Sequence, residues 1–287
     1  MRLEFPHPFD LKETLESGQA HRWKRYGQWY SGVVYGNLLH MRQDLFGVEV
    51  YSAPEKPEKL TPMLQSYFRL DDDLPAIYQG INKDSRIAEM IGHYPGMRLL
   101  RQEPWECLVA FICSATSNIP RIHNNMESIA NTYGTPVTLR DETRSTFPSP
   151  QQVADAGETA LRKLALGFRA KYLAVAARQV ADGELNLESL RTMPYWEARA
   201  RLEELPGIGA KIADCVLAFS LDKMEAFPID RWVSRAMHEW YLNGKKMNYD
   251  DIVRWAHEYF GPYAGYAQQY LFQGKRLEKK VARKTST

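Results

Sequence analysis

Residues 205–230 read LPGIGAKIADCVLAFSLDKMEAFPID. The stretch opens with a tight turn in which Gly207 and Gly209 allow positive φ angles and the close approach of another backbone. An apolar helix is predicted to begin near Ala210, so its free N–H groups point back at the turn and suit a phosphate. The stretch closes on a Pro-Ile-Asp that stops short of the next helix. The stretch therefore contains, in this order, a turn that suits a phosphate backbone, an apolar helix and a carboxylate.

Two charged residues of this stretch are candidates for chemistry. Lys211 lies in the first turn of the helix, where the helix dipole favours the neutral amine that can act as a nucleophile. Asp230 follows nineteen residues later as an acidic partner. Each has an ordinary alternative, because most lysines are solvated surface charges and an aspartate before a helix is usually an N-cap. Only their combination with the glycine turn favours a reactive site.

Composition limits the class of protein. The 287 residues are 44% hydrophobic and suffice for one large domain or two to three small ones. The net charge of +2 means that any DNA affinity must come from local clusters of positive charge. Three cysteines without a C-x₂-C pair exclude an iron–sulfur cluster of the usual four-thiolate kind and favour a reducing, intracellular setting. No apolar run approaches membrane-spanning length, so no membrane span is expected.

The residue pattern predicts an α+β protein. Residues 22–51 are rich in Trp, Tyr and Val and contain turn signals, which is typical of an antiparallel meander of three to four strands, with 29–35 and 38–42 as its clearest hairpin. Helical spacing dominates from about residue 60 onward. Residues 135–150 contain three prolines and are predicted to be a loop.

Several blocks resemble a known family. Residues 205–230 are similar to the helix–hairpin–helix and Gly/Pro…Asp signature of base-excision DNA glycosylases, and the ADC at 213–215 resembles the 8-oxoguanine DNA glycosylase branch. Further similar blocks follow in order around the hairpin, so that the resemblance covers nearly the whole chain: 96–108 (GMRLLRQEPWECL), 111–114 (FICS), 166–172 (LGFRAKY) and 261–268 (GPYAGYAQ), followed by Leu271 and Phe272.

The resemblance implies a division of the chain. A small antiparallel β-sheet domain is expected over residues 1–70 and a helical region over 71–287. The helical region is expected to form two mainly helical lobes, roughly 101–199 and 71–100 with 200–287. The helix–hairpin–helix motif is placed at about 195–221, and the cleft between the lobes is the expected ligand site.

The resemblance also implies a bifunctional glycosylase and abasic-site lyase. Lys211 is expected to attack C1′ of the sugar, release 8-oxoguanine and leave a Schiff base, after which β-elimination nicks the strand. Asp230 is expected to stabilise the cationic sugar. No redox cofactor and no catalytic metal are needed for these steps. The expected partner is double-stranded DNA that contains 8-oxoguanine, bound by a monomer that works inside the cell wherever DNA lies.

The resemblance also implies a pocket for the damaged base, formed by four residues. The Gly18 carbonyl is expected to accept the N7–H that 8-oxoguanine has and guanine lacks, which discriminates because guanine leaves the acceptor unpaired. Gln268 is expected to bind the Watson–Crick edge, and Cys215 and Phe272 to sandwich the ring. Cys215 lies four residues after Lys211, and this spacing fits an ordinary buried cysteine equally well.

The resemblance assigns further residues to the DNA. Phe168 is expected to fill the gap left by the extruded base, although a core aromatic is the ordinary alternative. The cytosine opposite is expected to be read by Arg121 and Arg169, whose ordinary role is a surface salt bridge, with Thr116 nearby. The turn at Gly207 and Gly209 is expected to hold a phosphate, and a monovalent cation is expected at the backbone carbonyls of Glu203, Leu205 and Ile208.

Four residues depart from the family pattern. Thr116 replaces a common asparagine near the opposite cytosine, Trp232 a histidine near a phosphate, His21 a phenylalanine beside the base pocket, and Lys275 an acidic residue that helps to hold the base. Selectivity for the opposite base and retention of the damaged base therefore stay open.

Other functions remain as alternatives. A pyrimidine glycosylase of the same superfamily normally has four cysteines after the aspartate, and no cysteine follows Cys215. An alkyl-purine glycosylase lacks the lysine. A DNA-binding helix–hairpin–helix protein without catalysis needs neither Lys211 nor Asp230.

Overall fold

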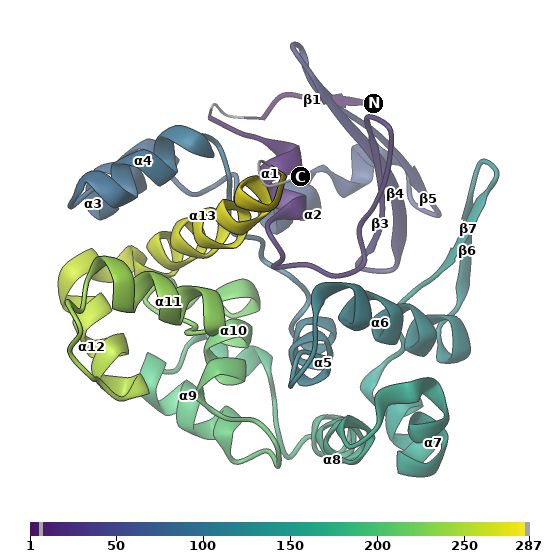
Figure 1. Cartoon of the computed structure of the whole chain (residues 1–287). Helices are drawn as coiled ribbons and strands as arrows, with labels where there is room; N and C mark the ends of the chain where they lie inside the picture. Colours follow the sequence, from purple (N-terminus) through teal and green to yellow (C-terminus); the bar gives the residue numbers. More distant parts are fainter. Residues whose placement is uncertain (6–7, 285–287) are drawn as a thin grey trace.

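The computed structural model describes residues 1–5 and 8–284. An antiparallel sheet is built from the N-terminal part of the chain, and helices make up most of the remainder (Figure 1). The predicted α+β fold class is confirmed.

The N-terminal sheet has five antiparallel strands in the order β1-β5-β4-β3-β2. The predicted hairpin is confirmed as β3 and β4, in which Val34 pairs with Asn37 across Tyr35 and Gly36. Both turn residues have positive φ, the geometry that matches the twist of two antiparallel strands. The prediction missed β1, which is too short to show a pattern and pairs with β5 at the sheet edge. The bounds are β1 Arg2–Leu3, β2 Lys24–Tyr26, β3 Trp29–Val34, β4 Asn37–Asp44 and β5 Gly47–Ala53.

The loop predicted over residues 135–150 is wrong in its first part, because the chain forms a second hairpin there. β6 (Pro136–Leu139) and β7 (Glu142–Ser145) turn through Arg140, which has a φ of 58°. Pro136 is tolerated because it is the first residue of its strand, and the hydroxyls of Thr138 and Thr143 form a cross-strand hydrogen bond of 2.8 Å. The hairpin extends beside β4 and β5, so it joins the helical region to the sheet (Figure 1).

Helices dominate the chain from Pro57 onward, as the helical spacing beyond about residue 60 predicts. Their bounds are α1 Leu11–Glu16, α2 Pro57–Tyr67, α3 Leu74–Ile81, α4 Ser85–His93, α5 Pro104–Cys113, α6 Ile119–Tyr133, α7 Pro150–Leu161, α8 Arg169–Ala181, α9 Tyr195–Glu203, α10 Ala210–Ser220, α11 Arg231–Trp240, α12 Tyr249–Phe260 and α13 Ala264–Lys284. Three short turns of π- or 3₁₀-helix join them: η1 Arg162–Leu166, η2 Glu188–Arg191 and η3 Gly261–Tyr263.

Two helices form the centre of the helical region. Nearly every residue of α5 and of α10 is buried, and the two helices pack on each other. Their sequences are apolar all round, which is typical of helices surrounded by protein. Because the C-terminal end of α5 meets the N-terminal end of α10, the side chains at these two ends come together.

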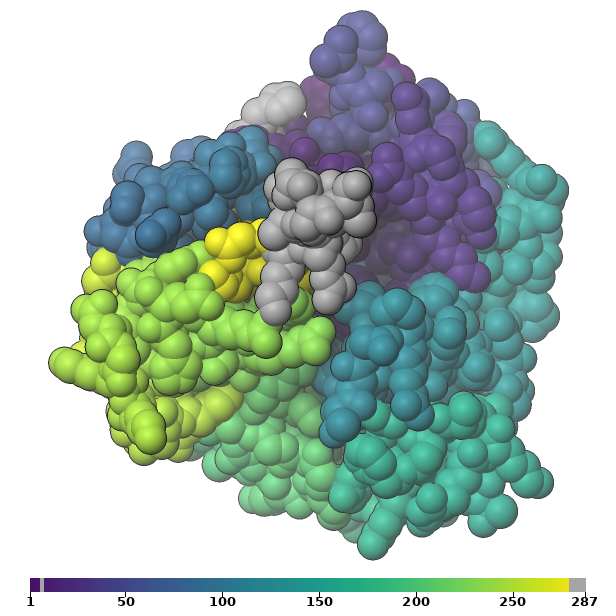
Figure 2. All heavy atoms as spheres, in the orientation of Figure 1, coloured from purple at the N-terminus to yellow at the C-terminus, as the bar shows by residue number. Residues whose placement is uncertain are grey.

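A second, smaller core lies under the sheet. It combines inward-facing strand residues with apolar residues of α1 and α2, such as Leu15 and Leu64, and it includes Leu100. The expected division at residue 70 and the division into two lobes stay predictions. Figure 2 shows the sheet and the helices of residues 104–181 packed against one another, with the C-terminal helices on the other side.

Glu127 on α6 is the charge that ties the second hairpin to the sheet. Its carboxylate accepts hydrogen bonds from Arg22 at 2.9 Å and from Arg144 of β7 at 2.8 Å, and it pairs with Lys24 at 2.9 Å. Burial alone raises the pKa of Glu127, but the charges of Arg144 and Arg22 and the hydrogen bonds from Lys24 and Arg22 outweigh burial and lower it to about 2.

We expect Glu127→Gln to lower the free energy of unfolding by about 2 kcal/mol at neutral pH, the pKa difference being discounted for solvent screening. A lowered carboxyl pKa stabilises the fold above the unfolded value of about 4.3, and this stabilisation is lost as the pH falls toward the folded value. The difference between wild type and variant, measured by urea unfolding, should therefore be full above about pH 5 and shrink toward about pH 2. A difference that stays constant across this range would contradict the assignment.

Candidate active site

The helix–hairpin–helix motif is confirmed and consists of α9, the glycine turn and α10. Gly207 has a φ of +82°, and a Cβ atom there would lie 2.4 Å from the ring of Tyr172. Gly209 is extended, with a φ of −107°, and caps the N-terminus of α10. The close approach expected of both glycines is therefore seen at Gly207 alone, since a Cβ on Gly209 would meet nothing within 4 Å.

We expect Gly207→Ala to destabilise the fold by about 2–4 kcal/mol. The new Cβ would strain the left-handed backbone at this position and would also overlap the ring of Tyr172. Gly209→Ala is the matched control in the same turn and should cost less than about 1 kcal/mol. Thermal unfolding of both variants tests this, and equal losses would show that the turn does not depend on Tyr172.

The amine of Lys211 lies at the junction of α10 and α5. Its Nζ donates a hydrogen bond of 3.0 Å to Ser114 Oγ, just after α5, and lies 5.3 Å from the centre of the Phe111 ring. The side chain is half-buried. One turn further along α10, the Cys215 thiol is buried. Burial raises the pKa of Cys215 to about 12 against the lowering effect of the Lys211 charge, so Cys215 is a neutral thiol at neutral pH.

Asp230 is both the N-cap of α11 and a neighbour of the lysine. Its Oδ1 accepts the backbone N–H groups of Trp232 at 2.8 Å and Val233 at 2.9 Å. Burial raises the pKa of Asp230, while these two hydrogen bonds and the positive charge of Lys211 lower it. The ordinary N-cap role is therefore real, and within residues 1–5 and 8–284 no hydrogen bond engages the second carboxylate oxygen.

Two residues of the expected base pocket meet, and a third lies next to them. A Cβ on Gly18 would lie 3.3 Å from a ring carbon of Phe272 and 3.3 Å from a guanidinium nitrogen of Arg276. Gln268 precedes Phe272 by one turn of α13 and is 3% exposed. Among residues 1–5 and 8–284, no hydrogen-bond donor reaches its Oε1. A buried amide oxygen without a partner is costly in a folded protein, which makes Gln268 a candidate for ligand binding.

His21 and Lys211 both lie near the ring of Phe111. Its ring packs edge-on against Phe111 with the centroids 5.8 Å apart, and neither ring nitrogen has a hydrogen-bond partner in the described part of the chain. Burial lowers the pKa of His21 to about 3, and the charges of Lys211 and His123 act in the same direction. This departure from the family pattern therefore places a neutral imidazole near the amine.

The residues expected at the opposite base lie around the start of α8. Phe168 is 48% exposed, so it is not a core aromatic. Arg169 is buried, and its guanidinium donates to the carbonyls of Ala115, Thr116 and Leu166, which replaces the surface salt bridge considered for it. Arg121 is exposed and is therefore the better placed of the two arginines for an outside partner.

Thr116 adopts a left-handed conformation, with a φ of 49°. β-branched residues rarely occupy this region, whereas asparagine tolerates it well. The position thus suits the asparagine that the family pattern has there.

Two other departures are placed by the structure. Lys275 pairs with Glu239 on α11 and with Glu278 at 2.6 Å, and its Nζ lies 4.6 Å from the centre of the Trp240 ring. Its charge is thus held by acidic partners. Trp232 lies at the start of α11, with the guanidinium of Arg231 4.8 Å from the centre of its ring.

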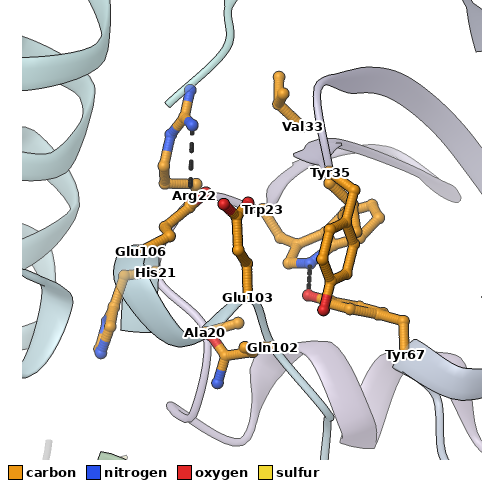
Figure 3. Close-up of a pocket in the computed structure, with 11 residues that line it drawn as sticks. Ala20, His21, Arg22, Trp23, Val33, Tyr35, Tyr67, Gln102, Glu103 and Glu106 are labelled. Atoms are coloured by element: carbon orange, nitrogen blue, oxygen red, sulfur yellow. Dashed lines mark hydrogen bonds and ion pairs between the residues drawn. The ribbon is translucent and has the colours of Figure 1, made fainter. Parts of the chain in front are cut away.

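A small pocket opens between the sheet and the start of α5 (Figure 3). Glu106 lies 3.6 Å from Arg22 there, and burial raises its pKa to about 7. His21 lines the edge of the pocket, and its ring points away from Glu106 and Arg22 (Figure 3). None of the four expected base-pocket residues lines this pocket, so it is a separate cavity.

Sequence reasoning missed the residues that support the site. Ser114 contacts the amine, and its signals were its place after the buried helix and within the similar block 111–114. Asp214 on α10 is buried and accepts hydrogen bonds from Tyr195 at 2.6 Å and Tyr249 at 2.7 Å. The hydroxyl of Tyr249 also accepts the N–H of Ile229 at 3.2 Å. It therefore links α10 to the segment that contains Asp230.

Three further observations bear on function classes. In the described ranges, no group of three or more His, Cys, Asp or Glu residues is arranged to hold a metal ion. Cys107, Cys113 and Cys215 are free and buried. No helix of residues 1–5 and 8–284 has the length and apolarity needed to cross a membrane.

Comparisons with known proteins agree with this geometry. The family "8-oxoguanine DNA glycosylase, N-terminal domain" matches residues 2–108, and "HhH-GPD superfamily base excision DNA repair protein" matches residues 109–262. The N-glycosylase/DNA lyase OGG1 of Arabidopsis thaliana is 34% identical over 279 residues, which cover 91% of this chain and 76% of that protein.

Solved structures are also similar. MBOgg1, in complex with a low-affinity DNA ligand, has a TM-score of 0.90 and 33% identity over 97% of this chain and 95% of its own. The Clostridium acetobutylicum 8-oxoguanine glycosylase/lyase, in complex with double-stranded DNA containing cytosine opposite 8-oxoguanine, has a TM-score of 0.89 and 30% identity over 94% and 93% of the two chains. Both halves of the chain therefore point to one class, the helix–hairpin–helix base excision DNA repair proteins. Within that class, this chain belongs to the 8-oxoguanine DNA glycosylase family.

Proposed function

We propose that this protein removes 8-oxoguanine opposite cytosine from duplex DNA and then nicks the abasic strand. Membership of a family whose relatives are N-glycosylase/DNA lyases supports this function. The observation that carries this proposal is the position of the Lys211 amine at the start of α10. The amine donates a hydrogen bond to Ser114, and its positive charge lowers the pKa of Asp230.

The glycosylase step forms a bond from Lys211 Nζ to C1′ and breaks the bond from C1′ to N9 of the base. The base leaves with the bonding electrons and takes up a proton. Positive charge develops on the sugar in this step, and the free oxygen of the Asp230 carboxylate stabilises it electrostatically. The amine acts as the nucleophile in its neutral form, and the adjacent Cys215 stays a thiol.

The lyase step follows from the imine. After Nζ has lost a proton, its lone pair forms a double bond to C1′, the C1′–O4′ bond breaks and O4′ takes up a proton. The result is a ring-opened, protonated Schiff base between Nζ and C1′, which acidifies the C2′–H. Removal of that proton and breakage of the C3′–O bond expel the 3′ phosphate and leave a nick. Neither step needs a redox cofactor or a metal.

The pocket and the DNA contacts keep the roles expected for them. The Gly18 carbonyl accepts the N7–H of 8-oxoguanine, the unpaired Gln268 Oε1 accepts a donor of the Watson–Crick edge, and Cys215 and Phe272 enclose the ring. The exposed Phe168 fills the gap in the stack, supported by the guanidinium of Arg169, which lies 4.6 Å from the centre of its ring.

The opposite strand and the backbone complete the proposal. Arg121 and Arg169, with Thr116, contact the estranged cytosine, and the turn at Gly207 and Gly209 holds a phosphate. A monovalent cation binds the carbonyls of Glu203, Leu205 and Ile208. The protein acts as a monomer inside the cell, where its DNA substrate is found.

Excision of 8-oxoguanine placed opposite C, A, G and T, measured by strand cleavage in single turnover, tests this function. The proposal expects the fastest cleavage opposite C. Excision of other damaged bases with 8-oxoguanine left intact would favour a related glycosylase, and binding without cleavage of any damaged duplex would favour a non-catalytic DNA-binding protein.

A further inference from the structure

The turn that carries Gly18 follows a very short helix. α1 ends at Glu16, Ser17 caps it, and Gly18 continues with a φ of +81°, a left-handed conformation that glycine adopts without strain. The last carbonyls of any α-helix lack intrahelical donors. The carbonyls of Glu16 and Ser17, at the end of the six-residue α1, therefore need donors from outside the helix.

Helix α13 supplies these donors. Gln269 Nε2 donates to the Ser17 carbonyl at 3.0 Å, and Arg276 Nη2 donates to the Glu16 carbonyl at 2.7 Å. The two side chains are seven residues apart and therefore lie on one face of the helix. Between them lies the buried Gln273. Its Nε2 donates a hydrogen bond to the Glu13 carboxylate at 3.1 Å, and its Oε1 accepts one from Arg276 at 2.5 Å. Figure 1 shows α1 beside the C-terminal half of α13.

The other side of Gly18 is held as firmly. The buried Gln19 side chain donates to the Arg98 carbonyl at 2.8 Å and accepts the Leu100 N–H at 2.7 Å. The backbone carbonyl of Gln19 accepts a hydrogen bond from Gln102 Nε2 at 2.9 Å. Within residues 1–5 and 8–284, in contrast, no donor bonds the carbonyl of Gly18 itself. The turn thus has fixed peptides on both sides of one free acceptor.

The same helix carries the proposed base pocket. Gln268 and Phe272 project from α13 next to the face that holds the turn. Phe272 and Arg276 lie against Gly18, since a Cβ there would be 3.3 Å from each of them. A loss of the Gln269 bond would therefore let the Ser17–Gly18 peptide move relative to Gln268 and Phe272. Displacements of about 1 Å at a reacting site can cost about 100-fold in rate.

We propose that Gln269 and Arg276 form a clamp that aims the Gly18 carbonyl at the N7–H of the damaged base, with Gln269 as the positioning residue for lesion specificity. This inference rests on the proposed function, because it assigns a role to the same pocket. The clamp orders the acceptor before the base arrives, so no binding energy is spent on ordering the turn.

The test compares two activities of one preparation. The first is single-turnover excision of 8-oxoguanine opposite cytosine, and the second is nicking of a duplex with a preformed abasic site opposite cytosine. The second activity uses Lys211 but presents no base to Gly18. For Gln269→Leu and Gln269→Glu, we expect excision to fall by about 10- to 100-fold and abasic nicking to stay within about threefold.

Gln152→Leu on α7 is the matched control, since it also removes a glutamine donor to a carbonyl, that of Tyr133 at 3.2 Å. Both activities should be unchanged in it. Equal losses of excision and nicking in the Gln269 variants would show that Gln269 only supports the fold, and full excision would show that the turn needs no clamp; either result overturns the inference. A wild-type protein that leaves 8-oxoguanine intact would instead contradict the proposed function.

Discussion

Replacement of Lys211 by glutamine is expected to lower 8-oxoguanine excision by more than about 10³-fold, because it removes the nucleophile from a reaction that forms a covalent intermediate. Glutamine is one bond shorter than lysine, but it remains a polar side chain with N–H donors in place of the amine that donates to Ser114 Oγ at 3.0 Å in the wild type. The fold and the DNA affinity should therefore persist. Single-turnover excision, together with binding of an undamaged duplex, measures both quantities.

Lys59→Gln is a suitable control, because Lys59 is an exposed lysine of α2 whose partner is Glu55. It should excise at the wild-type rate. Substantial excision by Lys211→Gln would show that another amine or a water molecule attacks the sugar.

The second large effect is expected at Asp230. Asp230→Asn removes the negative charge but keeps the oxygen that accepts the N–H groups of Trp232 and Val233, since asparagine caps helices as well as aspartate. Excision should fall by about 10²- to 10³-fold, the usual effect of deleting one electrostatic group in an active site. The free energy of unfolding should change by less than about 0.5 kcal/mol.

Asp73→Asn provides the comparison, because Asp73 caps α3 through the N–H of Ala76 in the same way. It should leave both stability and excision unchanged. A stability loss in Asp230→Asn that accounts for its whole loss of activity would reduce Asp230 to an N-cap.

The sequence determined those parts of the fold that depend on local pattern. The glycine turn and the apolar run after it predicted the turn and helix α10, and the family resemblance implied the helix–hairpin–helix as a whole. The Trp, Tyr and Val residues with turn signals over 22–51 predicted the β3–β4 hairpin. The second hairpin was missed, because three prolines over 135–150 outweighed its short strands. One of these prolines lies at a strand start, where it breaks no hydrogen bond.

The contacts of the site were less predictable, because they join residues far apart in the chain. Ser114 meets Lys211 over 97 positions, and Gln269 meets Ser17 over 252. Lys275 was considered as a departure that affects base retention, but its charge is bound by Glu239 on another helix. Such pairings depend on how the helices pack, which no local pattern encodes.

The central claim is that Lys211 forms a Schiff base with the sugar of the damaged nucleotide. Borohydride reduction during incubation with an 8-oxoguanine:cytosine duplex tests this most directly, followed by identification of the modified peptide. The account predicts a covalent protein–DNA adduct at Lys211 in the wild type and none in Lys211→Gln. An adduct that persists in Lys211→Gln, or the absence of any adduct with the wild-type protein, would contradict it.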